Sequence, residues 1–454
     1  MDVSNPLNQI VNLSKTQKQA VLLLSMGTFL EYFDLMLYIH LAVLLNDLFF
    51  SQNDHFSASL LGAFSFSVTF VFRPIGAILI GWLGDNIGRK STILFTTFAM
   101  AGSCVAMANL PTYEQVGVLA SWAVTICRII QGMSSMGEVI GAEIYLTEMI
   151  KPPMVYPAVG VLTIFVCLGC MAALFIVNII LSEGFNWRIA FWFGAVIALI
   201  GTFARTTLRE APDYADAKRR VINLWKDYKL DPKEPAKQLL LKKDKVSIKT
   251  AISLFFIQLL SPAVFYFVYI HCAGILKNKC GFTIAEIVQQ SLVVSIAELL
   301  FTGLFVYLSS VVHPLKILRT KYCLYFLFCL ACPYLLDKST IYFDILLIQI
   351  FTVVLMPGEC PAVPVFYKAF PILKRFTTVS FSFASSRAVM HVISSFGTVY
   401  LVQYFGNIGL LFLFSPIIIG YGFGLWHFFG LKNKDDLEML AKEIQIRKEA
   451  FVNV

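Results

Sequence analysis

The stretch Gly81-Trp82-Leu83-Gly84-Asp85-Asn86-Ile87-Gly88-Arg89-Lys90 connects two long apolar runs and decides the fold. Its glycines Gly81 and Gly88 suit a close helix approach and a sharp reversal, because a glycine has no Cβ. Asp85 can hold a neighbouring helix through charge-assisted hydrogen bonds. Arg89 and Lys90 begin the next run and suit an anionic membrane surface. The stretch therefore predicts a tight turn between two membrane-spanning helices.

The composition around this turn is that of a membrane protein. The 454 residues are 58% hydrophobic and 14% charged, whereas soluble domains carry about 25% charged residues. A helix needs about 20 apolar residues to cross a bilayer. Twelve such runs occur, near residues 20–45, 57–82, 91–110, 116–147, 157–181, 188–204, 250–273, 285–311, 317–336, 341–364, 376–403 and 407–430. We predict an all-α, polytopic membrane protein with twelve transmembrane helices in two six-helix bundles.

Lys and Arg predict the orientation, because short cytoplasmic loops are enriched in them. The cations assigned to one side are Lys15, Lys18, Arg89, Lys90, Lys151, Lys316, Arg319, Lys321, Lys368, Lys374 and Arg375. The connections on the other side are nearly free of cations, so both termini are predicted to be cytoplasmic. The predicted division is a cytoplasmic N-terminus (1–19), a first bundle (20–204), a cytoplasmic linker (205–249), a second bundle (250–430) and a cytoplasmic tail (431–454).

The linker and the tail each have an expected role at the membrane surface. The linker contains Arg205 and other cations, which the anionic inner leaflet is expected to hold. A regulatory docking site is the alternative. Apolar residues at helical spacing in the tail predict an amphipathic surface helix.

Ionisable residues inside the apolar runs are the candidate functional groups, since charges in hydrocarbon face a partner or a wet cavity. Glu31, Asp34 and Tyr38 fall on one face of the first predicted helix. Two carboxylates in one poorly solvated site do not both ionise at low cost, so the pair is expected to hold a proton. Pairing with Arg73 or Arg128 to join helices is the structural alternative. Either arginine could instead bind a substrate carboxylate.

Further candidates lie in later runs. Glu138 is expected to serve the substrate or proton site. In the second half Glu298, Arg387 and His391 are candidates, and a packed core histidine is the alternative for His391. The aromatic residues Tyr32 and Phe33, with Tyr38, could surround a quaternary ammonium, with lipid-facing packing as the alternative.

The quoted turn resembles the signature of the major facilitator superfamily, G-x-x-x-D-R/K-x-G-R-R/K, with Asn86 in place of a basic residue. Phe29-Leu30-Glu31-Tyr32-Phe33-Asp34-Leu35 resembles the L-E-W/Y-F-D run of that family's metabolite–proton symporter branch. Arg128–Glu138 is similar to its R-x-x-Q-G-x-x-x-G-G-E element, with Met136 in place of a glycine. The resemblance to proline/betaine transporter-like members covers residues 20–215.

The resemblance implies a gating motif at the turn, formed by Gly81, Asp85, Gly88, Arg89 and Lys90, with Glu143 and Glu148 as its partners. The corresponding loop of the second half departs from the family. Ser310, His313 and Pro314 stand at its acidic, glycine and arginine positions, so this second motif is expected to be lost.

The expected function is that of a secondary transporter, a proton-coupled symporter of a small zwitterionic osmolyte or carboxylate working by alternating access. An exchanger or facilitator without proton coupling is one alternative, and a non-transporting receptor or scaffold is another. No phosphate-binding loop or hydrolase motif occurs, so neither an ATP-driven pump nor an enzyme is expected. The expected partners are the solute, protons and the lipid bilayer, without nucleic acid, cofactor or metal. A monomer in a bacterial inner membrane is expected.

Overall fold

The computed structural model describes residues 13–50, 69–208, 210–227, 245–339 and 341–452. These residues form helices and their connections without a strand, so the predicted all-α fold is confirmed. The N-terminal half contains α1 (Lys15–Phe49), α3 (Arg73–Asn86), α4 (Arg89–Asn109), α5 (Tyr113–Val116), α6 (Val118–Ser135), η2 (Met136–Ile140), α7 (Gly141–Met149), α8 (Val155–Glu183) and α9 (Arg188–Arg205).

The C-terminal half follows after α10 (Pro212–Asp227). Its elements are α12 (Ile248–Tyr266), η3 (Phe267–His271), α13 (Cys272–Cys280), α14 (Ile284–Leu308), α15 (Pro314–Lys338), α16 (Tyr342–Leu355), α17 (Val363–Lys368), α18 (Ile372–Phe405), η4 (Gly406–Ile408) and α19 (Gly409–Val452). The chain divisions predicted at 204/205 and 249/250 remain predictions.

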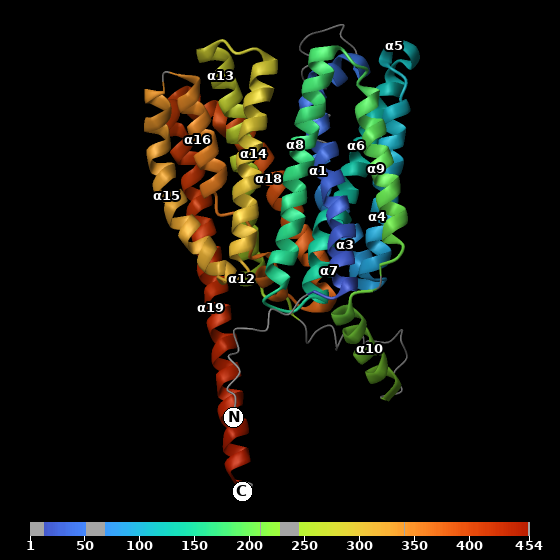
Figure 1. Cartoon of the computed structure of the whole chain (residues 1–454), viewed down its shortest axis with the longest axis vertical. Helices are drawn as coiled ribbons and strands as arrows, with labels where there is room; N and C mark the ends of the chain where they lie inside the picture. Colours follow the sequence, from blue (N-terminus) through green and yellow to red (C-terminus); the bar gives the residue numbers. More distant parts are fainter. Residues whose placement is uncertain (1–12, 51–68, 209, 228–244, 340, 453–454) are drawn as a thin grey trace.

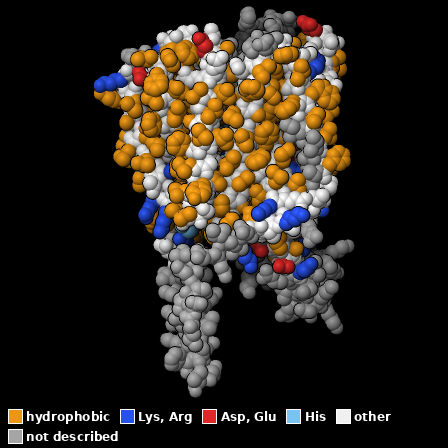
Figure 2. All heavy atoms as spheres, viewed as in Figure 1, with side chains coloured by type: hydrophobic (Ala, Val, Ile, Leu, Met, Phe, Trp, Pro, Cys, Tyr) orange, Lys and Arg blue, Asp and Glu red, His pale blue; other side chains and the backbone are white. Residues whose placement is uncertain are grey.

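Every predicted apolar run overlaps a helix, although residues 57–68 of the second run lie outside the described residues. The run 116–147 is divided among α6, η2 and α7, and the run 341–364 is interrupted after Leu355. By length and composition, six described stretches suffice to cross a membrane: Lys15–Leu41, Arg89–Asn109, Val155–Ile180, Ile248–Cys280, Ala285–Leu308 and Ile372–Asn433. Figure 2 shows the matching surface, a broad hydrophobic band with Lys and Arg gathered at its lower edge. The fold is that of a polytopic membrane protein.

The two halves stand side by side as two helical bundles (Figure 1). In the N-terminal half α1 packs on α8, and α4 packs on α6 and α9. In the C-terminal half α12 packs on α18 and α19, and α15 packs on α16. The halves meet where α3 contacts α18 and where α8 contacts α14. The turn between α3 and α4 lies at the end of the two bundles that is drawn at the bottom in Figure 1. We call this end the lower end.

The helix predicted for the tail is present as far as Val452. It is not a separate element, because residues 431–452 continue α19, a single helix of 44 residues. This helix projects past the lower end (Figure 1). Its placement on the membrane surface remains a prediction.

Close packing of α1 on α8 depends on Gly169. A Cβ at this position would stand 2.4 Å from the carbonyl oxygen of Phe29 and 3.1 Å from the backbone nitrogen of Phe33. Small residues allow membrane helices to approach closely, because association there relies on packing rather than on exclusion of water. Gly169 therefore sets the distance between these two helices.

We expect Gly169→Ala to destabilise the fold by about 1–3 kcal/mol, because the backbone of α1 must move away. Gly102→Ala on α4 is the matched control, since a Cβ there meets no atom within 4 Å and alanine favours a helix. Thermal unfolding of the purified variants in detergent measures both. An unchanged melting temperature for Gly169→Ala would contradict this account of the α1–α8 contact.

Candidate functional site

The turn between α3 and α4 is held by the buried side chain of Arg89, the first residue of α4. Gly88 before it has φ +145°, a conformation that favours glycine. Arg89 Nη1 donates to Asp85 Oδ1 at 2.9 Å, and Arg89 Nε and Nη2 donate to the two carboxylate oxygens of Glu148 at 3.1 and 3.0 Å. The sequence prediction places these three residues together, and the structure does so.

The same charges join the two halves of the molecule. Asp85 accepts hydrogen bonds from the backbone nitrogens of Phe376 (3.2 Å) and Thr377 (2.9 Å) on α18, and from Thr377 Oγ1 (2.7 Å). Arg375 Nη1 pairs with Glu148 Oε1 at 3.0 Å. We call Asp85, Arg89, Glu148, Arg375 and Thr377 the lower-end network. It links the two halves at the lower end by charge-assisted hydrogen bonds.

The remaining residues of the predicted motif have different roles. A Cβ on Gly81 would stand 2.6 Å from Thr377 Cα, so this glycine permits the contact between α3 and α18. Lys90 contributes its backbone nitrogen, which donates to Glu210 Oε1 at 3.3 Å. Glu143 does not join the network, since it accepts from Tyr367 Oη at 2.7 Å. In the corresponding loop of the C-terminal half, His313 caps α15 by accepting from Leu315 N at 3.2 Å.

Two buried ion pairs hold the carboxylates predicted on α1. Glu31 Oε1 accepts from Arg73 Nη2 of α3 at 2.9 Å. Asp34 pairs with Arg128 Nη1 of α6 at 3.2 Å. The Arg128 guanidinium lies 3.9 Å from the centre of the Tyr38 ring. Each carboxylate is therefore paired with a different arginine. These contacts are the ones described by the structural alternative, in which the carboxylates pair with Arg73 and Arg128 to join helices.

Glu138 forms a third buried pair, and its partner corrects an expectation. Arg205, predicted to lie in the linker at the lipid surface, ends α9 and is fully buried. Its Nη1 contacts Glu138 Oε2, and Thr96 Oγ1 also donates to Glu138, at 3.2 Å. The apolar run ends at residue 204, so a count of apolar residues alone places this arginine one position outside the helix.

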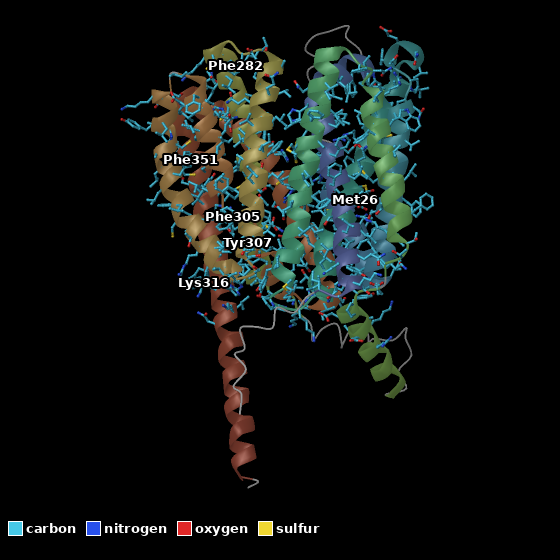
Figure 3. All side chains as sticks on the ribbon, viewed as in Figure 1. Met26, Phe282, Phe305, Tyr307, Lys316 and Phe351 are labelled. Atoms are coloured by element: carbon cyan, nitrogen blue, oxygen red, sulfur yellow. The ribbon has the colours of Figure 1, made fainter. Side chains whose placement is uncertain are left out.

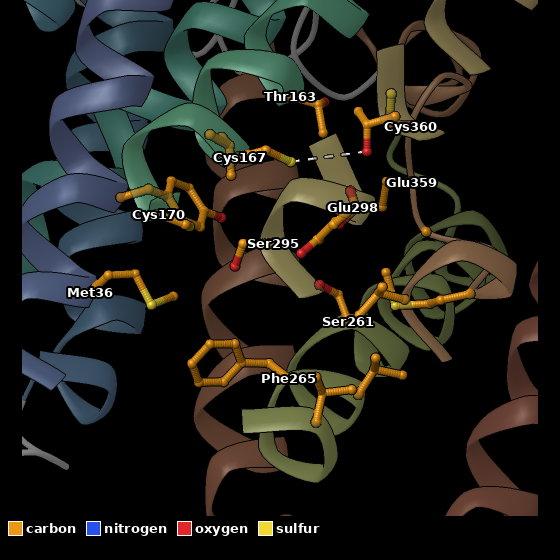
Figure 4. A pocket seen from close by; sticks show the side chains of 18 of the residues that line it. Met36, Thr163, Cys167, Cys170, Ser261, Phe265, Ser295, Glu298, Glu359 and Cys360 are labelled. Carbon is orange, nitrogen blue, oxygen red and sulfur yellow. Dashed lines mark hydrogen bonds between the residues drawn. The ribbon is translucent and has the colours of Figure 1, made fainter. Parts of the chain in front are cut away.

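A cavity of about 220 Å³ lies between the halves. Its charged lining residues are Glu143, Glu298, Lys321, Glu359 and Arg387. Figure 4 shows Glu298 and Ser295, from α14, and Cys167 and Cys170, from α8, around it. Of the predicted substrate or proton residues, Arg387 lines this cavity, whereas Glu31, Asp34, Tyr38, Arg128 and Glu138 do not.

Part of the cavity wall is not helical. The predicted run 341–364 ends its helix at Leu355, and Met356–Ala362 is irregular before α17 begins. Gln258 Nε2 donates to Glu359 Oε2 at 3.1 Å, and Tyr421 Oη donates to the Gly358 carbonyl at 3.1 Å. Irregular backbone at membrane depth is tolerated where it lines a cavity or is buried in protein. The continuous helix predicted here is thus corrected.

Arg387 lies between this cavity and a smaller one of about 80 Å³ that Tyr32, Arg73 and His391 also line. The Arg387 guanidinium stacks 3.2 Å from the centre of the Phe383 ring. Its Nη1 is buried without a hydrogen-bond partner among the described residues, and so is Arg73 Nε. The His391 ring packs 3.7 Å from that of Phe70. Two guanidinium groups with unused donors thus face one small space.

Sequence reasoning missed two charged residues of the cavity. Lys321 was assigned to a cytoplasmic loop, but it lies within α15, lines the cavity and has its Nζ 4.2 Å from the centre of the Phe305 ring. Glu359 was not considered. Its signal was present in Pro357-Gly358-Glu359-Cys360-Pro361, where an acidic residue stands between two helix-breaking prolines inside an apolar run. In the described part of the chain, no group of His, Cys, Asp or Glu suits a metal ion.

Two helical bundles around an interhalf cavity, joined at one end by a charged turn, are the architecture of a membrane transporter fold. The sequence matches the family model of the Major Facilitator Superfamily over residues 24–394. The chain therefore belongs to the Major Facilitator Superfamily, a family of membrane transporters.

Relatives and solved structures agree with this assignment. The chain is 34% identical over 210 residues to the inner membrane metabolite transport protein YhjE of Escherichia coli K12, covering 43% of this chain and 47% of the relative. It is 31% identical over 209 residues to a "Putative proline/betaine transporter" of Staphylococcus haemolyticus, covering 44% of each. These matches span about half the length of the relatives. The structure of the proton:xylose symporter XylE bound to 6-bromo-6-deoxy-D-glucose matches at a TM-score of 0.73 with 16% identity, over 91% of this chain and 96% of that one.

We expect Asp85→Asn to open the lower end, because a neutral amide gives weaker hydrogen bonds to α18 and Arg89. A charge-assisted hydrogen bond contributes about 1.5–3 kcal/mol, so the open population should rise about tenfold or more. The measurement is the rate at which a membrane-impermeant maleimide on the lower-end side labels Cys360, which lines the cavity, followed by mass spectrometry.

Asp216→Asn is the matched control, since Asp216 is an exposed acid on α10 at the same end. Its labelling rate at Cys360 should equal that of the unmodified protein. Equal rates in Asp85→Asn and the control would show that the network does not close this end.

Proposed function

We propose that the chain is a secondary active transporter that carries a small zwitterionic solute or carboxylate across the bacterial inner membrane by alternating access. The observation that carries the proposal is the charged cavity between the two halves, since transporters of this architecture hold their substrates near the midplane. Its volume of about 220 Å³ is below the roughly 300–1,000 Å³ of sites for drug-sized ligands, so the solute is small. The name of the Staphylococcus haemolyticus relative, a putative proline/betaine transporter, supports the same class of solute.

Arg387 is the proposed ligand of the solute carboxylate. A buried guanidinium with an unused donor is costly, and a carboxylate accepts two parallel hydrogen bonds from such a group. Arg73 Nε, across the smaller cavity, is available to the same anionic group. Tyr32 lines both cavities and offers an aromatic face to the cationic end of the solute.

The charge balance of the cavity supports proton coupling. Its described lining contains three carboxylates, Glu143, Glu298 and Glu359, and two cations, Lys321 and Arg387. A zwitterion adds no net charge, so one proton on a carboxylate would make the occupied cavity neutral, which favours movement through a poorly solvated interior.

Glu143 is the proposed proton carrier. It belongs to α7 in the N-terminal half, yet it accepts from Tyr367 and faces the charge of Glu359, both in the C-terminal half. Glu31 and Asp34, where the sequence placed the proton, are each already paired with an arginine. We propose that these pairs, with Glu138–Arg205, keep the N-terminal bundle rigid and orient Tyr32, which lies between Glu31 and Phe33 on α1.

The lower end is the proposed cytoplasmic end. Lys and Arg gather at the lower edge of the hydrophobic band (Figure 2), as they do on the cytoplasmic side of membrane proteins. The N-terminal end of α1 and the C-terminal end of α19 lie at this lower end (Figure 1). In this orientation the lower-end network closes the path to the cytoplasm, and the protein is proposed to act as a monomer.

We expect Arg387→Gln to weaken solute binding by about 10- to 100-fold, because two charge-assisted hydrogen bonds are lost. Uptake of radiolabelled betaine and proline into proteoliposomes measures the apparent affinity. Arg319→Gln is the control, because Arg319 is an exposed arginine near the start of α15. Saturable binding without any flux in the unmodified protein would favour a receptor over a transporter.

We expect Glu143→Gln to abolish accumulation driven by an inward pH gradient while solute exchange across the membrane continues. A side chain that is always neutral still allows the solute-loaded transporter to change between its two open states. It cannot bind a proton on one side and release it on the other. Glu114→Gln, an exposed acid on α5, should keep gradient-driven accumulation. Accumulation by the unmodified protein that ignores a protonophore would contradict proton coupling and favour an exchanger or facilitator.

A further inference from the structure

A second, larger cavity lies at the lower end, away from the interhalf cavity. It has a volume of about 1010 Å³, and its walls come from the start of α8, the start of α12, α17 and residues 426–432 of α19. The N-terminal half of the chain contributes Pro152, Val155 and Tyr156 to the wall, and the other described lining residues belong to the C-terminal half. We call this space the basic cavity.

The charge of the basic cavity has one sign. Three lysines, Lys249, Lys368 and Lys432, and two histidines, His313 and His427, line it, and its described lining contains no Asp or Glu. The histidines are engaged with neighbours: His427 Nε2 lies 3.0 Å from Thr250 Oγ1, and His313 caps α15. The lysines are therefore the groups available to an anion, and Asp213, which lies outside the lining, is the acid that interacts with Lys368.

An apolar strip leads from the basic cavity along the hydrophobic band. Trp426 lines the cavity, is 67% exposed, and has Lys249 Nζ 5.3 Å from the centre of its ring. On α19, Phe423 comes four residues after Ile419, and Trp426 comes three residues after Phe423. The three exposed side chains therefore share one face of the helix. Ile248 and Ile252 are exposed in the same way on α12, which packs beside α19.

This combination fits a phospholipid better than a soluble anion. An exposed tryptophan is typical of the membrane–water boundary, which places the lysines at the depth of lipid phosphates. A soluble phosphate compound would use the lysines and leave the apolar strip without a role. Basic pockets between transmembrane helices at this boundary bind anionic lipid headgroups.

We propose that the basic cavity is a binding site for an anionic phospholipid. Lys249, Lys368 and Lys432 bind its phosphate, and its acyl chains lie along Trp426, Phe423 and Ile419. The cavity includes residues of both halves, so the bound lipid contacts α8 on one side and α17 and α19 on the other. This proposal does not depend on the identity of the solute.

The test measures binding of phosphatidylglycerol to the purified full-length protein in neutral detergent, by native mass spectrometry and by the shift in melting temperature. The variant replaces Lys249, Lys368 and Lys432 by Gln. The control replaces Lys15, Lys18 and Lys316, three exposed lysines outside the cavity. Figure 3 shows Lys316 at the lower end of α15. A third variant replaces the three cavity lysines by Arg, and phosphatidylcholine and inorganic phosphate are the comparison ligands.

We expect the cavity variant to bind phosphatidylglycerol about fivefold more weakly for each lysine removed, since each lysine near a membrane surface contributes about 1 kcal/mol. The control and the Arg variant should bind as the unmodified protein does, and the Arg variant shows that the fold tolerates changes here. Equal loss in the control would mean general surface attraction and would overturn the proposal. Binding of inorganic phosphate that depends on the three lysines, or equal binding of phosphatidylcholine, would also overturn it.

Discussion

The structure depends on the cost of placing a charged side chain in hydrocarbon. An ionised group inside a membrane costs at least about 2.5–3.5 kcal/mol unless it has a partner or water. Glu31, Asp34 and Glu138 meet this constraint with one arginine each. The first two pairs join α1 to α3 and α6, and the third joins η2 to α9. Among the described residues, Glu143, Glu298, Lys321, Glu359 and Arg387 line the interhalf cavity, where the two bundles meet. Charge pairing thus links helices within the N-terminal half, whereas the cavity between the halves is lined by charged residues of both.

The same constraint explains the lower-end network. Arg89 and Arg375 share Glu148, and Asp85 takes the backbone nitrogens of α18. When the halves separate, each of these groups can regain water, because the network lies at the membrane boundary rather than in its interior. The ion pairs of Glu31 and Asp34 on α1 are buried and have no such access to water. In the proposed alternating access, motion between the halves exchanges partners at the lower end while the pairs Glu31–Arg73 and Asp34–Arg128 stay intact.

Composition and periodicity predicted the helices, the two groups of six and the turn at Gly81–Lys90, because apolar length and glycine spacing are local properties. Spacing also placed Glu31 and Asp34 on one helix face, but it could not show that Arg73 and Arg128 would reach them separately. Lys321 was missed because the cavity is formed by helices far apart in sequence. Glu359 was missed because its irregular segment lies inside an apolar run that predicts a continuous helix. Arg205 was misplaced because helix ends are uncertain by a few residues.

The most direct test of the central claim measures the distance between the lower ends of the two halves in proteoliposomes. Spin labels on Ser91, exposed at the start of α4, and on Lys316, exposed at the start of α15, report this distance by pulsed electron paramagnetic resonance. The account predicts two distance populations whose proportions change when betaine or proline is added, and a loss of the shorter one in Asp85→Asn. A single distance that neither solute nor the substitution alters would contradict alternating access around the charged cavity.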